Sequence, residues 1–190
     1  MDRRQRIANA GIALIARGGT HRLTHRAVDA EAGLPNGSTS YYARSRRDLI
    51  RLVMEQLSAE SQADLTDIEV PGKLTVRQAT DLVGRLAERL ILNGDAQAAR
   101  FALMFEVRDD DELRRELTVD APVRRSFDEK AVELLRALGV ADPEEKAPEF
   151  VALVDAVLMY RAVDAAPIDP ACVVGTYLTG LVRRKPTAAR

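Results

Sequence analysis

The chain has 190 residues, of which 46% are hydrophobic and 30% are charged, and its formal net charge is −1. A chain of this length can bury a substantial core, in one domain or in two small ones. No apolar run approaches the ~18 residues that a membrane span needs, and the N-terminal MDRRQRI opens an amphipathic pattern instead of a secretory signal. We therefore expect a cytoplasmic protein.

Helical periodicity dominates the chain from its beginning. Ile7, Leu14 and Ile15 share one face of a first helix, which we expect to end at Gly18-Gly19. A long helix is predicted from Arg47 to about Leu65, and further helices at about residues 75–92, around 101–105, and at about 122–138, 143–165 and 169–184. No convincing strand pattern appears, so the predicted fold class is all-α.

Residues 24–49 read THRAVDAEAGLPNGSTSYYARSRRDL, a pattern typical of two short helices joined by a tight turn. Thr24 is an N-cap residue for the first of them, and Gly33 is expected to end it because glycine tolerates a left-handed conformation. Pro35 presets the backbone before a second helix that begins at Asn36 or Gly37. That helix carries hydroxyl groups suited to phosphates or base edges, so the segment predicts a helix-turn-helix DNA-binding unit.

These residues resemble the start of a TetR-type transcriptional regulator. The matching positions are Gly33, Gly37, Ser45, Arg46 and Leu49, while Ser40 and Ala43 replace the tyrosine and phenylalanine usual in the family. The resemblance implies a three-helix DNA-binding domain over residues 1–46, a helical effector-binding and dimerisation domain over 47–185, and a flexible tail over 186–190. The expected DNA-contacting residues are Thr24, His25, Arg26, Asn36, Gly37, Ser38, Thr39, Tyr41, Tyr42 and Arg46.

The charge distribution supports this interpretation independently. Residues 1–51 hold ten arginines against four acidic residues, a balance of +6, and the remainder of the chain therefore carries −7. Solvated surface arginines are the ordinary explanation of such an imbalance. In combination with the motif, however, the basic segment 1–51, called the basic head below, and the acidic remainder of the chain favour one surface that binds nucleic acid.

An apolar effector pocket is predicted between the helices that follow. Its expected lining is Leu86, Phe101, Met104, Phe105 and Phe127, with Arg100, Glu106, Arg108, Asp155 and Arg161 as possible polar anchors. Ordinary core packing explains each of these apolar residues as well. The pocket is therefore an expectation that rests mainly on the family resemblance, whose members release DNA when a small molecule enters the helical body.

The last two helices carry more apolar residues than one contact face requires. The resemblance implies that they pair with their copies in a homodimer, with Val154, Leu158, Val174, Tyr177, Leu178 and Leu181 in the interface. A wholly internal hairpin is the alternative. The single cysteine, Cys172, lies in this apolar stretch and is expected to be a buried structural thiol.

Catalytic and metal-binding constellations are not recognisable in the sequence. His21 and His25 lie in the basic head, and the acidic run at residues 109–112 lacks the glycine and alternating ligands of a calcium loop. We expect no enzyme activity, cofactor or metal. The predicted function is a DNA-binding repressor released from double-stranded operator DNA by a small-molecule effector, and the alternative is an all-helical protein-interaction module without sequence-specific DNA binding.

Overall fold

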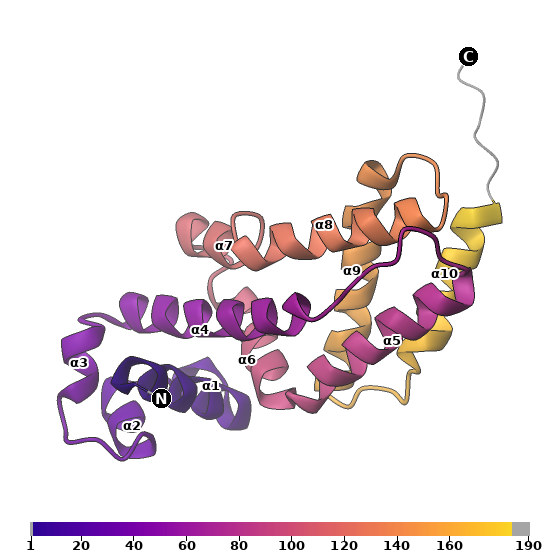
Figure 1. Cartoon of the computed structure of the whole chain (residues 1–190). Coiled ribbons are helices and arrows are strands. Elements are labelled where there is room, and N and C mark those ends of the chain that lie inside the picture. Colours follow the sequence, from indigo (N-terminus) through magenta and orange to yellow (C-terminus); the bar gives the residue numbers. More distant parts are fainter. Residues whose placement is uncertain (1, 184–190) are drawn as a thin grey trace. The chain divides into compact units, whose positions relative to one another are not determined.

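The structure is a computed structural model that describes residues 2–183, and these residues form helices and connecting loops without a strand (Figure 1). They pack into two compact units. Within the described residues, unit 1 comprises residues 2–62 and 93–123, and unit 2 comprises residues 63–92 and 124–183. This division concerns packing, whereas the predicted boundary between residues 46 and 47 concerns function and stays a prediction. The tail predicted over 186–190 lies outside the described residues.

Unit 1 contains the N-terminal helices and a later helical pair. Its elements are α1 (Arg3–Gly18), the 3-10 turn η1 (Thr20–Arg22), α2 (His25–Glu31), α3 (Ser38–Tyr42), most of α4 (Arg46–Thr66), α6 (Gly94–Glu106) and α7 (Asp111–Leu117). A capping box starts α1, in which Gln5 N donates to Asp2 Oδ1 at 2.8 Å and Asp2 N donates to Gln5 Oε1 at 3.1 Å. The first predicted helix and its end at Gly18-Gly19 are confirmed.

A single apolar core holds unit 1 together. It is built on α1, α2, α4 and α6 and includes Ile7, Ile15, Leu23, Val28, Leu49, Val53 and Leu103. Gly11 allows α1 to approach α4 closely, since a Cβ placed there would lie 2.6 Å from Val53 Cγ2. Because that distance is shorter than any normal carbon contact, a larger residue at position 11 would force the two helices apart.

Unit 2 consists of α5 (Val76–Leu92), most of α8 (Pro122–Ala137), α9 (Pro143–Ala162) and α10 (Pro170–Arg183). Its core includes Ala79, Val83, Leu135, Phe150, Val151, Val174 and Leu178. The rings of Phe150 and Tyr177 stack with centroids 5.9 Å apart, which joins α9 to α10. None of the helices in the described part of the chain is long and apolar enough to cross a membrane.

Two expectations about α9 and α10 need correction. Leu158, Val174 and Leu178 are almost completely buried within a single chain, so they offer no surface to a partner, and Val174 and Leu178 belong to the core of unit 2. Cys172 is exposed and is not a buried structural thiol. Val174 lies two positions further along the helix, which places the two side chains on different faces of α10. Of the predicted interface residues, Val154, Tyr177 and Leu181 are half-buried.

Candidate DNA-binding site

The two short helices of the predicted DNA-binding unit, α2 and α3, are called the reader helices, or the reader, below. Local hydrogen bonds fix where they begin and end. Thr24 caps α2, because its hydroxyl oxygen accepts a hydrogen bond from Ala27 N at 3.2 Å. The ring of His25, at the start of α2, lies 2.8 Å from the carbonyl oxygen of Ala43, at the end of α3. The first and last residues of the pair are therefore tied together, as a fixed angle between two short helices requires.

The turn between α2 and α3 depends on two glycines. Gly33 has φ +61° and Gly37 has φ +90°, both in the left-handed region that side chains with a Cβ rarely adopt. A Cβ at Gly37 would meet nothing within 4 Å, so the backbone conformation alone explains the glycine. The predicted end of the first helix near Gly33 and the predicted start of the second near Gly37 are both confirmed.

Asp29 fastens α3 to α2. Its carboxylate accepts hydrogen bonds from Gly37 N at 2.7 Å, Thr39 N at 2.7 Å and the Thr39 hydroxyl at 2.6 Å. Burial by itself raises the pKa of Asp29, but the hydrogen bonds from Thr39 and Gly37 outweigh it and hold the pKa below its usual range. A carboxylate on α2 therefore caps α3. The sequence analysis did not predict this contact, for which the only signal was an acidic residue within a basic segment.

Most of the predicted DNA-contacting side chains of α2 and α3 are accessible. Thr24, Arg26, Asn36, Gly37, Tyr41 and Tyr42 are exposed, and His25 and Ser38 are half-buried. Thr39 is completely buried and its hydroxyl is bound to Asp29, so we correct the expectation that it contacts DNA. Its role is to hold α3 in place. Ser40 and Arg44 are exposed on and directly after α3, and sequence reasoning passed over both.

Arg46 serves a structural purpose that the sequence did not predict. Its guanidinium donates to Leu23 O at 2.7 Å, to Thr20 O at 2.9 Å and to Glu106 Oε1 at 2.8 Å. These three acceptors belong to η1, to the residue just after it, and to the end of α6. Arg46 is nevertheless exposed, and its contact with phosphate stays a prediction.

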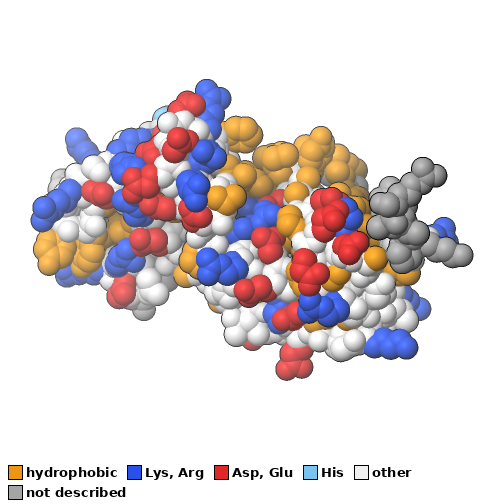
Figure 2. Space-filling model, turned by 90° about the horizontal axis from the view of Figure 1, so that it is seen from above, with side chains coloured by type: hydrophobic (Ala, Val, Ile, Leu, Met, Phe, Trp, Pro, Cys, Tyr) orange, Lys and Arg blue, Asp and Glu red, His pale blue; other side chains and the backbone are white. Residues whose placement is uncertain are grey.

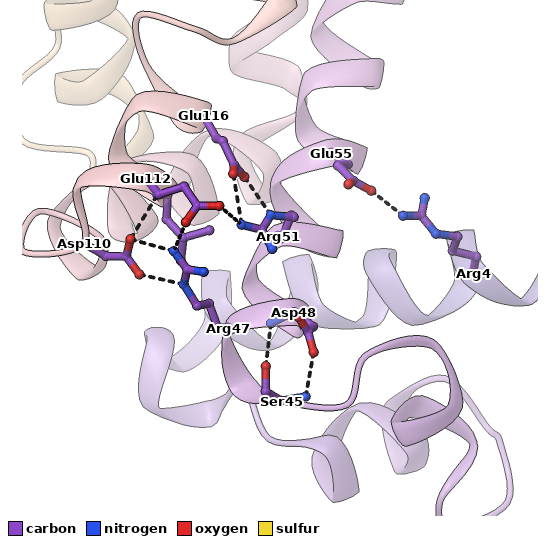
Figure 3. A network of polar contacts seen from close by, with 10 residues as sticks. Arg4, Ser45, Arg47, Asp48, Arg51, Glu55, Asp110, Glu112 and Glu116 are labelled. Atoms are coloured by element: carbon purple, nitrogen blue, oxygen red, sulfur yellow. Dashed lines mark hydrogen bonds and ion pairs between the residues drawn. The ribbon is translucent and has the colours of Figure 1, made fainter.

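A second set of ion pairs joins α4 to α7 and to its N-cap residue, Asp110 (Figure 3). Arg47 forms a bidentate pair with Asp110 at 2.8 and 3.0 Å, and Arg51 forms another with Glu116 at 2.8 and 2.9 Å. Glu112 bridges the two, accepting from Arg47 at 2.8 Å and from Arg51 at 3.0 Å. Bidentate pairs of this kind fix direction as well as distance.

The network perturbs the titration of its members in the direction that ion pairing requires. Hydrogen bonds from Arg47 lower the pKa of Asp110 to about 2, and the hydrogen bonds that Arg47 donates to Asp110 and Glu112 raise the pKa of Arg47. Beside the network, Ser45 and Asp48 form the capping box that starts α4 (Figure 3). The Ser45 side chain and backbone hold the pKa of Asp48 below its usual range.

The residues predicted to line an effector pocket are divided between the units. In unit 1, Phe101 is buried under the guanidinium of Arg100, Met104 is half-buried, and Phe105 is 69% exposed. In unit 2, Leu86 and Phe127 are half-buried. None of the five borders the groove of about 400 Å³ between α4 and the segment from Glu116 to Pro122. The pocket stays a prediction.

Comparison with known proteins identifies the class. Residues 74–184, more than half of the chain, match the family described as "Tetracyclin repressor-like, C-terminal domain". The chain therefore belongs to the TetR family of transcriptional regulators, as its N-terminal motif indicated. No curated protein matches the sequence at a significant level.

Solved structures agree with this membership. A TetR-family member from Streptomyces coelicolor A3 is 25% identical, with 95% of this chain and 98% of that chain covered and a TM-score of 0.68. The multidrug binding protein EbrR, complexed with proflavin, is 27% identical, with 95% and 99% covered and a TM-score of 0.56. A transcriptional regulator from Rhodococcus sp. Rha1 is only 14% identical, but its TM-score of 0.78 over 96% and 97% shows the same fold.

Family membership decides between the broad alternatives. It identifies a transcriptional regulator and not an enzyme, and it favours the DNA-binding interpretation over the protein-interaction module. Among the residues that the structure describes, no group of three or more His, Cys, Asp or Glu side chains is arranged to hold a metal ion.

Proposed function

We propose that this regulator is a homodimeric repressor that leaves its operator when a small molecule binds. The observation that carries the proposal is the architecture of unit 1, in which exposed polar and basic groups stand on two short helices whose angle is fixed by Asp29, His25 and two left-handed glycines. Rigid presentation of a short helix is what reading base edges in the major groove requires.

The proposed DNA surface centres on the exposed end of α3. Tyr41 is 83% exposed, and Asn36, Ser40 and Arg44 are exposed around it. We assign Tyr41, Ser40 and Asn36 to groove contacts and Arg44, together with Arg26 of α2, to phosphate contacts. The arginine excess of residues 1–51 would draw the duplex to this end of unit 1.

The proposed dimer uses the faces of α9 and α10 that unit 2 leaves open. Ala152, Ala156 and Tyr160 are exposed at four-residue spacing on α9, and Thr176 and Gly180 are exposed on α10. An open groove of about 620 Å³ runs along this face of α10. Small side chains let helices approach closely, so a second copy fits here, with Val154, Tyr177 and Leu181 at the margins.

The proposed effector is a small organic molecule bound by the helical body. The support is the family relationship and the likeness to EbrR, which has been solved with proflavin and with ethidium. Both compounds are planar aromatic cations, so they are suitable first probes. The predicted contacts are Phe101, Met104 and Phe105 in unit 1, and Leu86 and Phe127 in unit 2, each set taken by itself.

Selection from a random duplex library tests the proposal as a whole. The purified protein should enrich a sequence containing two inverted half-sites, because a two-fold symmetric dimer presents two reader helices. Binding to the enriched duplex should weaken steeply with salt. Proflavin or ethidium should then raise the melting temperature of the protein and release the duplex. Retention of no duplex, or enrichment of a single half-site by a monomer, would refute the proposal.

The dimer face has its own control. Ala156→Arg should abolish dimerisation in sedimentation while leaving the helical circular dichroism unchanged, because the side chain is exposed in the single chain. Glu88→Arg on the exposed surface of α5 is the matched substitution and should leave the dimer intact.

A further inference from the structure

We propose that Glu106, the last residue of α6, is a positioning residue for DNA recognition. Its carboxylate holds the turn that precedes α2 and the first turn of α4 in one arrangement. This inference rests on the proposed DNA-binding role of α2 and α3, and it concerns a residue that the sequence pattern suggested only as a polar anchor for an effector.

The carboxylate of Glu106 accepts hydrogen bonds from two different elements of unit 1. Its Oε2 accepts from the Thr20 hydroxyl at 2.7 Å, and its Oε1 accepts from Arg46 Nη2 at 2.8 Å. The same Arg46 guanidinium donates to Thr20 O and Leu23 O. Glu106, Thr20 and Arg46 therefore form a closed ring of hydrogen bonds that joins α6, η1 and α4, all inside unit 1.

This ring acts on the element that starts the reader. Leu23 is buried in the core of unit 1, and Thr24 follows it as the N-cap of α2. Both backbone carbonyls that Arg46 binds lie within four residues of this cap. Displacement of Arg46 would leave these carbonyls to water and would loosen the start of α2. The orientation of α2 sets that of α3, because Asp29 binds the two together.

Charge supports the ring and explains why a carboxylate is needed. Hydrogen bonds from Arg46 and Thr20 lower the pKa of Glu106, so the group is ionised at neutral pH. A neutral amide in its place would still accept one hydrogen bond but would lose the charge-assisted partner of Arg46. Near DNA, an Arg46 freed in this way would be drawn towards phosphate and away from the two carbonyls.

Glu112 provides a matched control in the same unit. Like Glu106, it is an exposed glutamate whose carboxylate accepts two hydrogen bonds, in this case from Arg47 and Arg51 (Figure 3). None of its hydrogen bonds reaches η1 or Arg46. Glu106→Gln and Glu112→Gln therefore remove the same charge from unit 1, but only Glu106→Gln breaks hydrogen bonds to η1 and Arg46, whereas Glu112→Gln breaks ion pairs between α4 and α7.

The test measures affinity for the duplex selected by the wild-type protein. Glu106→Gln should weaken binding about tenfold, the scale expected when hydrogen bonds to charged groups are lost. Glu112→Gln should stay within about twofold, because the exposed ion pairs that it weakens join α4 to α7 and reach neither η1 nor Arg46. Thr20→Val should weaken binding in the same direction, and Thr20→Ser, which keeps the hydroxyl, should restore it. Melting temperatures establish that each variant is folded.

A double-mutant cycle and an exchange measurement separate positioning from a general loss of stability. In an Arg46→Met background, Glu106→Gln should add little further loss of affinity, because both changes open the same ring. Amide hydrogen exchange at residues 22–24 should accelerate in Glu106→Gln and not in Glu112→Gln.

Equal affinities for Glu106→Gln and Glu112→Gln, additive losses in the cycle, or unchanged exchange at residues 22–24 would each overturn the inference. If the wild-type protein retained no duplex, the proposed function would fail. The exchange comparison would still decide whether Glu106 holds the turn.

Discussion

Units 1 and 2 each have an apolar core, but they differ in the polar contacts that supplement it. In unit 1, ionised side chains far apart in the sequence bind one another or the backbone, as do Asp29 and Thr39, Arg46 and Glu106, and Arg47 and Asp110. In unit 2, the helices are joined by apolar packing such as that of Phe150 on Tyr177. Several of its ion pairs join residues three or four positions apart on one helix.

This difference is consistent with the roles proposed for the two units, DNA recognition by unit 1 and dimerisation by unit 2. Hydrogen bonds and bidentate ion pairs are directional, so they fix the angle at which a helix is presented. Apolar packing is non-directional and tolerates small shifts between helices. Figure 2 shows acidic and basic side chains intermingled over much of one face of the molecule. The comparison predicts that substitutions in unit 2 act mainly on stability and those in the reader mainly on DNA affinity.

The largest effect on folding is expected in unit 2. Leu178 is fully buried, so Leu178→Ala should lower the free energy of unfolding by about 2 to 5 kcal/mol through lost burial and the cavity left behind. Urea denaturation measures the change. Val182→Ala on the same helix is the control, because Val182 is 43% exposed and should cost far less. A change at Leu178 no larger than at Val182 would contradict the core assignment.

A smaller loss is expected at the junction of α2 and α3. Asp29→Ala would leave the buried Thr39 hydroxyl and two backbone N–H groups without their acceptor, at a cost of about 1 to 3 kcal/mol. DNA affinity should fall by more than the stability change explains, because α3 is no longer held at its angle. Glu31→Ala, two residues on, breaks only a surface pair with Arg17 and should change both quantities little.

The sequence was sufficient for the helices and for the local devices that start and end them. Helices were predicted at about 75–92 and 122–138, and the structure has Val76–Leu92 and Pro122–Ala137. The cap at Thr24 and the turn at Gly33 and Gly37 follow from residues close together in the chain. Periodicity and capping act over a few residues, so one sequence reports them.

Partners distant in the chain were beyond the sequence. The residues around Arg46 do not indicate that its side chain binds Glu106, sixty residues later in the chain. The residues around Thr39 do not indicate that Thr39 is buried. The apolar run of α10 likewise does not say which face is internal, so Val174 and Leu178 were assigned to a partner when they belong to the core. Such facts depend on how helices pack, which is a tertiary property.

The ion pairs between α4 and α7 should appear as a pH effect on unit 1. The pKa of Asp110 is about 2, below its ordinary value of 3.8, because Arg47 binds the charged form. The stabilisation is therefore complete above the ordinary value and is lost as the pH falls towards 2. Carboxyl NMR titration should find that Arg47→Gln raises the pKa of Asp110. The pKa of Asp48, which depends mainly on Ser45, should stay low; an unmoved Asp110 would count against the pairing.

The smallest effect on folding, with a clear effect on recognition, is expected at Tyr41. The ring is 83% exposed and its only aromatic contact in the described part of the chain is the edge of Tyr42, 5.1 Å away between centroids. Tyr41→Ala should therefore change the free energy of unfolding by less than about 0.5 kcal/mol. Its affinity for the selected duplex should nevertheless fall by the equivalent of about 1 to 3 kcal/mol if the side chain reads the groove.

Tyr41→Phe divides that loss between the ring and the hydroxyl, since a hydrogen bond to a base edge or phosphate disappears while the ring contact remains. Val119→Ala removes a comparably exposed apolar side chain of unit 1 outside the reader and should alter neither quantity. Unchanged DNA affinity in Tyr41→Ala would remove Tyr41 from the reading surface. DNA binding would then have to rest on Asn36, Ser40, Arg44 and Arg26, and the proposed difference between a stability unit and a recognition unit would depend on those four side chains.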